Sequence, residues 1–411
     1  MAQVVIFLGI VLIVVFGIHF YLWWRLFRST TRPGSRVRRI GGWLIAAADL
    51  ILIATLVLTR DSSLHWLAAI GYIWLAVMFY LLVTLGVLEI PAAIAKRIAA
   101  PKAARAEPTV PDAGAIKPGA LADRPVDHVT DDDRSDGRID RRLFIARATA
   151  ITAGVVATGT TAFGVTQALS APRLKRRQIA LAKLPRSMDG YRVALVSDIH
   201  LGPLAGRKHA QRVVDAINGL DADIVAVVGD LVDGTVAELG ADAAPLRDLR
   251  HRDGAYFVTG NHEYFSGFEP WLAEVAELGL KPLRNERVEL PGGLDLAGVN
   301  DVTGSQYDDA PDFAKALGDR DPAKAVVLLA HQPIQVERAA QFGVDLQLSG
   351  HTHGGQMVPF NLIVGLQQPV INGYDVINGT QIYVTNGAGF WGPPVRVGAP
   401  PDVTVIELRA T

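Results

Sequence analysis

The chain has 411 residues, a formal net charge of −1 at pH 7 and a hydrophobic fraction of 50%. Its length exceeds what one hydrophobic core needs, so we expect more than one structural unit. The near-zero net charge favours no polyanionic partner, and we therefore expect no nucleic-acid binding. The absence of cysteine excludes disulfides, thiolate catalysis and cysteine-based zinc sites.

Apolar residues are concentrated in the N-terminal part of the chain. Residues 1–90 form a membrane region with three apolar stretches, and residues 141–171 hold a fourth, which is rich in Ala, Gly, Thr and Val. The first stretch lacks a charged n-region and a small-residue cleavage site, so we interpret it as a retained helix and not as a cleaved signal peptide. Each stretch is long enough to cross a bilayer as a helix, and the predicted spans are 2–24, 41–59, 64–88 and 148–171.

Basic residues predict the orientation of these helices. The loop after the first stretch, residues 25–39, holds six arginines, whereas the short loop at 60–63 holds one. Basic loops stay on the cytoplasmic side, which places the N-terminus outside and, after three further crossings, the rest of the chain outside as well. The basic run from Arg173 to Arg177 then lies on the outer face, which long translocated domains tolerate. We therefore expect a multi-pass protein of the cell membrane whose C-terminal part, residues 185–411, is extracytoplasmic.

Two segments precede the fourth stretch. Residues 91–140 are rich in Ala, Pro and Asp without apolar periodicity, which predicts a disordered cytoplasmic linker. The run Arg141-Arg142-Leu143-Phe144, followed by an apolar helix, resembles a twin-arginine export signal. An arginine pair that flanks a membrane helix on its inner side is the alternative interpretation.

The sequence pattern changes after Tyr191. Five runs rich in β-branched residues (RVALVSD, ADIVAVVGD, AYFVTGN, AVVLLAH and DLQLSGH) each end in polar residues or glycine. Continuous apolar runs of this length predict strands buried on both faces. Helical patterns lie between them at 208–220, 269–279 and 334–342. This alternation predicts an α/β catalytic domain over residues 185–411.

Polar residues follow the ends of these strands, at the edge where α/β folds collect their ligand sites. Each residue alone is a weak signal, but the ordered set is specific and contains five of the ten histidines. The set is Asp198-x-His200, Gly229-Asp230-x-x-Asp233, Gly260-Asn261-His262-Glu263, His331 and Gly350-His351-x-His353.

This order of motifs resembles the calcineurin-like metallophosphoesterases over about residues 190–411, and the phrases LVSDIHLG, VTGNHEY and LSGHTHGGQ are similar to the membrane-associated bacterial branch. The resemblance implies a four-layer αββα sandwich of two mixed sheets, here preceded by about four transmembrane helices. It also implies two divalent metal ions. By position, Asp198, His200 and His353 would hold one ion, Asn261, His331 and His351 the other, Asp230 would bridge them, and His262 would be the catalytic histidine.

The residue types support a two-metal site independently. Oxygen and imidazole ligands without thiolate suit Mn²⁺, Fe²⁺, Co²⁺ or Zn²⁺. Two ions about 3.5–4 Å apart would lower the pKa of a bridging water, clamp the phosphate oxygens and stabilise developing charge. His262 is expected to protonate the leaving oxygen, and Asp233 to orient His262 and keep it protonated.

One position departs from the family pattern. Gly234 stands where many members have arginine after the second aspartate, which weakens the case for phosphomonoester and phosphoprotein substrates. Substitute phosphate-binding residues could be Arg207, His209, Arg284 or Arg396. In the tail, we expect Phe390 and Trp391 to pack within a Gly/Pro-rich loop, and contact with lipid or substrate is the alternative.

We therefore expect hydrolysis of a phosphodiester or pyrophosphate bond in a lipid-linked or cell-envelope substrate, because an anchor confines enzyme and substrate to one layer. The resemblance suggests activities like those of UDP-diacylglucosamine hydrolases or phospholipid phosphodiesterases. A metal-binding sensor without turnover is the alternative, but it predicts a missing ligand or acid, and all are present. A transporter is disfavoured because Asp49 alone offers little polar lining to three helices.

Overall fold

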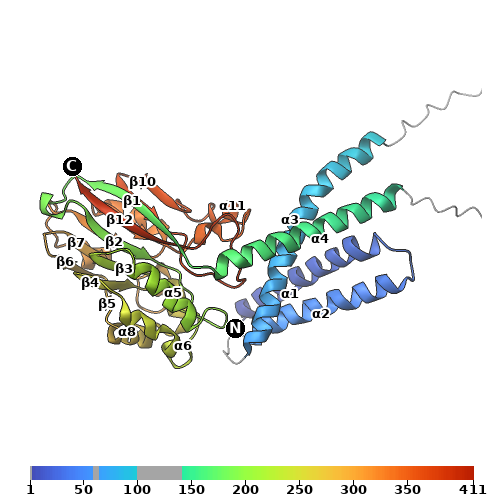
Figure 1. Cartoon of the computed structure of the whole chain (residues 1–411), viewed down its shortest axis with the longest axis horizontal. Helices are drawn as coiled ribbons and strands as arrows, with labels where there is room; N and C mark the ends of the chain where they lie inside the picture. The colour runs from blue at the N-terminus through green and yellow to red at the C-terminus, as the bar shows by residue number, and fades with distance from the viewer. Residues whose placement is uncertain (1, 59–63, 100–140) are drawn as a thin grey trace, which may run out of the picture.

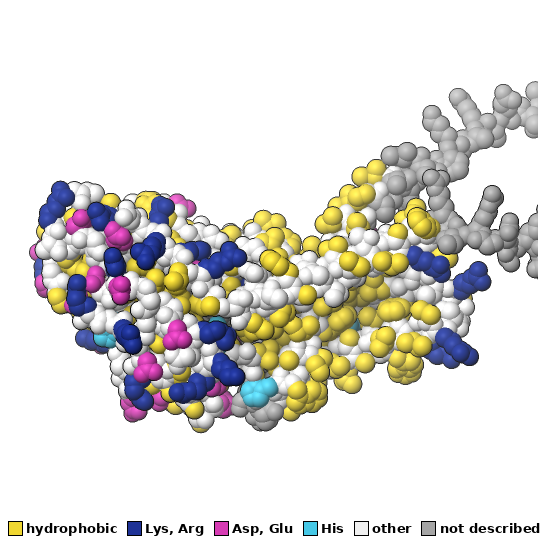
Figure 2. All heavy atoms as spheres, in the orientation of Figure 1, with side chains coloured by type: hydrophobic (Ala, Val, Ile, Leu, Met, Phe, Trp, Pro, Cys, Tyr) yellow, Lys and Arg dark blue, Asp and Glu magenta, His cyan; other side chains and the backbone are white. Residues whose placement is uncertain are grey.

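The computed structural model describes residues 2–58, 64–99 and 141–411 (Figure 1). Its N-terminal part is a bundle of long helices whose surface is largely apolar (Figure 2). Among the described residues, four helices are long and apolar enough to cross a membrane, which confirms that prediction. They are α1 (Ala2–Trp23), α2 (Arg36–Leu58), α3 (His65–Ala99) and α4 (Arg141–Leu169).

The third helix is longer than its predicted span. α3 continues through Pro91 to Ala99, so residues 91–99 are helical and not part of a disordered linker. The alanine-rich sequence after Pro91 has a high helix propensity, which explains the extension. The rest of the predicted linker, residues 100–140, lies outside the described residues.

A buried polar cluster inside the bundle gives Asp49 a partner that the sequence did not reveal. The Nδ1 atom of His19 on α1 lies 2.9 Å from Oδ1 of Asp49 on α2. Trp74 on α3 donates its indole N–H to Nε2 of His19 at 2.9 Å. The same Nδ1 atom also lies 2.9 Å from the carbonyl of Val15, so one N–H faces two acceptors, and the cluster connects α1, α2 and α3.

The C-terminal part contains two six-stranded mixed sheets. In the first sheet, β2 to β5 run parallel, while β12 pairs antiparallel to β2 and parallel to β1. Its order is β1 (Arg173–Leu181), β12 (Asp402–Ala410), β2 (Tyr191–Val196), β3 (Ile224–Val228), β4 (Gly254–Val258) and β5 (Lys281–Pro282). The order of the second is β10 (Gly373–Ile377), β11 (Thr380–Val384), β9 (Leu346–Ser349), β8 (Val326–Leu329), β7 (Asp295–Gly298) and β6 (Glu286–Glu289).

The two sheets pack face to face and helices cover their outer faces. Along β2, Val193 and Leu195 enter the core between the sheets, whereas Ala194 and Val196 enter the core under the helices. This two-sided burial explains why the strands are continuous apolar runs. The predicted four-layer αββα sandwich is confirmed. The first sheet is covered by α5 (Arg207–Asn218), α6 (Val236–Ala243) and α8 (Phe268–Glu277), and the second by α9 (Phe313–Leu317) and α10 (Val336–Gln341).

The helical bundle and the C-terminal domain are in direct contact. Val395 is fully buried in one apolar cluster with residues of the transmembrane helices, including Leu22. The amide of Arg396 donates to the carbonyl of Gly164 on α4 at 2.9 Å. At the other end of the contact, His65 at the start of α3 donates to the carbonyl of Pro203. The C-terminal domain therefore packs on the bundle and is not connected to it by a free linker alone.

Candidate metal centre

The structure brings all of the predicted site residues into one cluster at the carboxyl ends of the strands. Their side chains come from both sheets, because the loops after β2, β3 and β4 meet those after β8 and β9. The residues are Asp198, His200, Asp230, Asp233, Asn261, His262, His331, His351 and His353.

A first ligand group lies where the loops after β2 and β9 meet. Nε2 of His200 is 3.0 Å from Nε2 of His353, and Oδ1 of Asp198 is 3.3 Å from the same His353 atom. All of these donor atoms lie within 4.8 Å of one another, as one ion requires. Burial and then the Arg396 charge hold the pKa of His353 well below its usual range, so this imidazole is neutral.

A second group faces the first across Asp230. Oδ2 of Asp230 lies 3.2 Å from Nε2 of His331 and 3.7 Å from Nε2 of His200. The amide oxygen of Asn261 lies 3.3 Å from His331 Nε2 and 3.0 Å from His351 Nδ1. Asp230 thus stands between the two groups, where a bridging carboxylate belongs. Although burial opposes ionisation, the charges of His331 and His262 keep the pKa of Asp230 well below its usual range.

Asp233 contacts two imidazoles. Its Oδ1 accepts from Nδ1 of His200 at 2.7 Å and from Nδ1 of His262 at 2.8 Å. The first contact directs the other nitrogen of His200 toward the first ligand group, as carboxylates behind metal-bound histidines do. The second orients His262. Burial lowers the pKa of His262, but Asp230 and Asp233 outweigh it and raise this pKa to about 9.

The backbone at the cluster adopts a conformation that most residues avoid. Asp198, His200, Asp230, His351 and His353 all have left-handed φ angles, between 49° and 69°. Such angles are uncommon outside glycine, and each costs about 1–2 kcal/mol. Their concentration at the candidate ligands indicates that the fold sustains local strain in order to turn these side chains inward.

Glu263 is a supporting residue to which the sequence assigned no role. Its side chain is buried and accepts backbone N–H groups of Asp230, Leu231 and Gly260 at 2.9, 2.7 and 2.6 Å. These bonds fix the loop that carries Asp230 to the turn that precedes Asn261. Its place directly after Asn261-His262 was the only sequence signal.

Arg396 lies behind the cluster and not in front of it. The side chain is fully buried. Its guanidinium contacts the carbonyls of His353, Asn386 and Gly389, and one nitrogen lies 3.0 Å from Nδ1 of His353. Arg396 therefore positions His353 and is not free to bind phosphate.

The other expected substitutes for the missing arginine lie elsewhere. Arg207 donates to the carbonyl of Ala241, and Arg284 forms an ion pair with Asp309 at 2.8 Å. His209 is buried on α5 and borders a separate cavity. None of these side chains has a contact with the predicted ligands in the part of the chain that the structure describes.

Two exposed aromatic rings flank His262. The ring centroids of Phe265 and Trp391 lie 5.6 and 6.0 Å from that of His262. Phe265 is 63% exposed and Trp391 is 57% exposed, so the packing expected for Trp391 is wrong, whereas Phe390 is buried as expected. The Gln356 side chain explains the difference, because it bonds the Trp391 amide and carbonyl and holds this residue at the surface.

The cluster fits divalent cations by its donor set and its shape. Its donors are imidazole nitrogens and carboxylate and amide oxygens, the combination that first-row transition metals accept. The loops also leave no room for side chains at Gly260 and Gly350, where a Cβ would collide with the carboxylates of Asp230 and Asp198 respectively. The close approach of backbone and ligands at both positions is what a compact metal centre needs.

Comparisons with known proteins agree with this chemistry. A family model described as calcineurin-like phosphoesterase matches residues 191–355. An uncharacterized metallophosphoesterase of Aquifex aeolicus is 34% identical over 58% of this chain and 92% of its own length. A transmembrane protein with metallophosphoesterase domain of Bos taurus is 36% identical over 67% of this chain.

Other similar proteins are matched over a smaller share of their own length or align less well. An uncharacterized metallophosphoesterase of Helicobacter pylori J99 is 40% identical over 60% of this chain. The matched region spans 66% of the length of both the Helicobacter and the bovine relative. Among solved structures, a dimetal phosphatase of Danio rerio aligns with 54% of this chain at 11% identity and a TM-score of 0.35.

Proposed function

The chain belongs to the calcineurin-like phosphoesterases, and from this premise we propose that it hydrolyses a phosphodiester or pyrophosphate bond in a lipid-linked substrate, using two metal ions. The observation that carries the proposal is the paired ligand clusters around Asp230, with His262 beside them.

Each residue has a defined task in this proposal. Asp198, His200 and His353 would hold one ion, Asn261, His331 and His351 the other, and Asp230 would contact both. Bound divalent cations such as Mn²⁺, Fe²⁺, Co²⁺ or Zn²⁺ supply Lewis acidity and the positive charge that a phosphate needs in its transition state.

His262 is our candidate for the general acid. Asp233 accepts from its Nδ1 at 2.8 Å, which fixes the ring and stabilises the protonated imidazole. The ring can then deliver a proton to the leaving oxygen. The exposed rings of Phe265 and Trp391 would receive the organic part of the substrate.

The position of the site beside the bundle supports a lipid-linked substrate. Met357 packs with residues of the transmembrane helices, and the segment after it contains α11 (Asn361–Val364). In this segment, Leu362, Ile363 and Leu366 are 70%, 56% and 84% exposed. Figure 1 places α11 at the end of the catalytic domain that faces the bundle. Exposed apolar residues there would enter the membrane interface and bring the site close to lipids.

We also propose that the catalytic domain is extracytoplasmic. The basic loop between α1 and α2 lies at the end of the bundle far from the catalytic domain (Figure 2), and basic loops remain cytoplasmic. Because the chain has no cysteine, Lys281→Cys gives a single label site. A membrane-impermeant maleimide should label it in intact cells. Labelling only after lysis would place the domain inside.

Replacement of both Arg141 and Arg142 by Lys, followed by the same labelling, tests whether this pair acts as a twin-arginine signal.

The catalytic proposal is tested with the full chain in detergent. After metal removal, each cation is added back singly, and hydrolysis is measured on bis(4-nitrophenyl) phosphate and on phospholipid and nucleotide-lipid pyrophosphate substrates. We expect turnover that depends on the metal, is lost in His262→Ala and Asp230→Asn, and is retained in Asp248→Asn, whose side chain is exposed on the catalytic-domain surface. Tight metal binding without turnover on any of these substrates would instead indicate a sensor module.

A further inference from the structure

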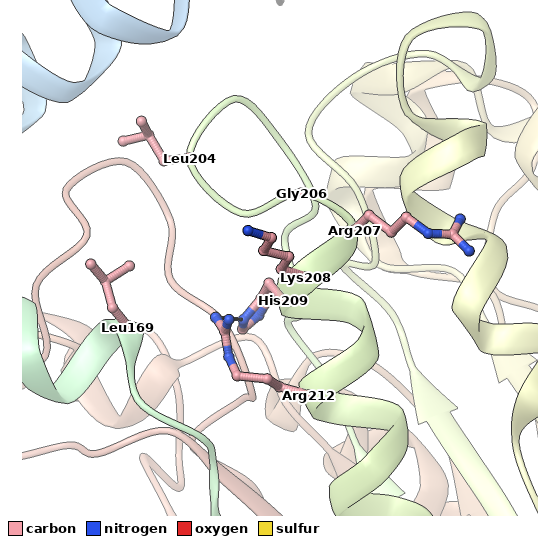
Figure 3. Close-up of a pocket in the computed structure, with 7 residues that line it drawn as sticks. All are labelled: Leu169, Leu204, Gly206, Arg207, Lys208, His209 and Arg212. Carbon is pink, nitrogen blue, oxygen red and sulfur yellow. Dashed lines mark hydrogen bonds between the residues drawn. The ribbon is translucent and has the colours of Figure 1, made fainter.

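A basic cavity of about 450 Å³ lies where the last transmembrane helix meets the catalytic domain. Leu169 at the end of α4 and Leu204 form its apolar side, and the first turns of α5 form its basic side. Figure 3 shows the side chains of Lys208, His209 and Arg212 directed to the same space, whereas Arg207 points away from it.

The cations of this cavity are not neutralised by the protein. Among the described residues, neither Lys208 nor Arg212 forms an ion pair. Arg207 is engaged elsewhere, with its side chain on the carbonyl of Ala241 and its amide on Asp242. Two unpaired cations facing one cavity create a local positive potential that attracts an anion.

Hydrogen-bond donors at the cavity also lack acceptors. His209 is 98% buried, since only 2% of its surface is exposed, and its Nε2 makes no well-formed hydrogen bond, with only a weak interaction to the backbone of Ile199. Its Nδ1 lies 3.3 Å from an Arg212 nitrogen, and a guanidinium can only donate, so a neutral His209 carries its proton on Nε2. The Nε atom of Arg212 is buried without a partner. Buried donors are nearly always paired in proteins, so these two indicate a missing acceptor.

The surroundings specify what kind of anion fits. Phe390, Ala168 of α4 and Ala205 form a small apolar cluster, and Leu204, which lines the cavity, packs against it, so the apolar side of the cavity is continuous with α4. His65 and Pro203 join α3 to the same loop. A ligand here would have its charge on α5 and its apolar part along α4, whose candidate membrane span ends at Leu169.

We propose that this cavity binds the phosphate of an anionic phospholipid, through Lys208, Arg212 and the His209 N–H, with the acyl chains against Leu169 and Leu204. The site is separate from the metal centre and does not depend on hydrolysis there. It would attach the catalytic domain to the membrane surface, in addition to the anchoring that the transmembrane helices provide.

The test uses the full chain in a mild detergent and native mass spectrometry. Dioleoylphosphatidylglycerol and dioleoylphosphatidylcholine are titrated separately, and bound lipids are counted at each concentration. The parent should bind the anionic lipid at least tenfold more tightly than the zwitterionic one. Each cation near an anionic lipid contributes roughly a factor of five, so the double variant Lys208→Gln/Arg212→Gln should lose about 25-fold in affinity for phosphatidylglycerol.

A matched double variant, Lys281→Gln/Arg250→Gln, removes two exposed cations outside the cavity and should bind like the parent. Asp230→Asn should also bind like the parent, which separates this proposal from the catalytic one. Unchanged phosphatidylglycerol binding in the cavity variant, or equal affinity of the parent for both lipids, would overturn the proposal. Displacement of the lipid by equimolar inorganic phosphate would show an anion site without lipid specificity and would overturn it too.

Discussion

Replacing Asp233 by asparagine isolates the charge of the residue that contacts both His200 and His262. Both contacts are made by the same oxygen, Oδ1, at 2.7 and 2.8 Å, so the asparagine carbonyl can keep both hydrogen bonds. A hydrogen bond to a charged group contributes about 1.5–3 kcal/mol and a neutral one about 0.5–1.5 kcal/mol, so the two bonds together lose about 2–3 kcal/mol. Because the Asp233 side chain is 24% exposed, solvent screening favours the lower value.

A loss of about 2 kcal/mol corresponds to an approximately 30-fold fall in kcat/KM. The pH profile should change as well. Burial lowers the pKa of His262 while Asp230 and Asp233 raise it to about 9, so loss of the Asp233 charge should shift the alkaline limb of kcat/KM to lower pH. The assay is hydrolysis of bis(4-nitrophenyl) phosphate between pH 6 and 10, with Asp248→Asn as the control. An Asp233→Asn enzyme with the activity and pH profile of the parent would refute this role.

Three further changes should have measurable effects. Gly350→Ala places a Cβ against Ser197 and Asp198, so the free energy of unfolding should fall by about 2 kcal/mol or more. Tm should fall by roughly 4–8 °C and the metal content should decrease. A normal Tm and a normal metal content would contradict the packing argument. Chelation should abolish hydrolysis, and Mn²⁺, Co²⁺ or Zn²⁺ but not Ca²⁺ should restore it; activity that survives full metal removal would exclude the two-metal reaction. Burial and Arg212 lower the pKa of His209 to about 4, so below about pH 6.5 the unfolded chain binds a proton that the folded chain does not. Stability should therefore fall between about pH 6.5 and 4 by up to about 3 kcal/mol, and this slope should be smaller in His209→Phe, as measured by urea unfolding in lipid-free detergent; equal slopes would contradict it.

The central strands could be predicted because their burial on both faces makes them continuous apolar runs. The helices predicted at 208–220, 269–279 and 334–342 correspond to α5, α8 and α10 within a few residues. β1 was missed because it is an edge strand with mostly exposed residues, and its basic run Lys175-Arg176-Arg177 was interpreted only as a membrane flank. Its partner β12 lies at the other end of the chain, and local patterns carry no information on such a pairing.

The candidate ligands could be predicted because metal binding restricts residue type and because strand ends restrict their place. The supporting residues could not. Glu263 accepts hydrogen bonds from backbone N–H groups more than thirty residues away in sequence. The sequence alone does not show which acceptor the fold will bring close to these groups. Arg396 was one of four candidates for phosphate binding because of its charge, yet the structure buries it behind His353. The partner of a long polar side chain depends on tertiary packing, which residue type does not reveal.

The hydrogen bond between the Arg396 amide and the Gly164 carbonyl limits the distance at which the metal centre can lie from the transmembrane helices. An enzyme on a flexible tether samples many heights above a bilayer, but here the loop that steadies His353 is seated on α4 itself. Under the proposed function, the metal centre would act at one fixed height, and lipids whose scissile phosphate lies deeper or farther out would be excluded by position alone. For the same reason, cutting the chain after α4 would expose Val395 and leave the Arg396 amide without its acceptor, so we expect the truncated domain to be less stable than the same domain in the full chain.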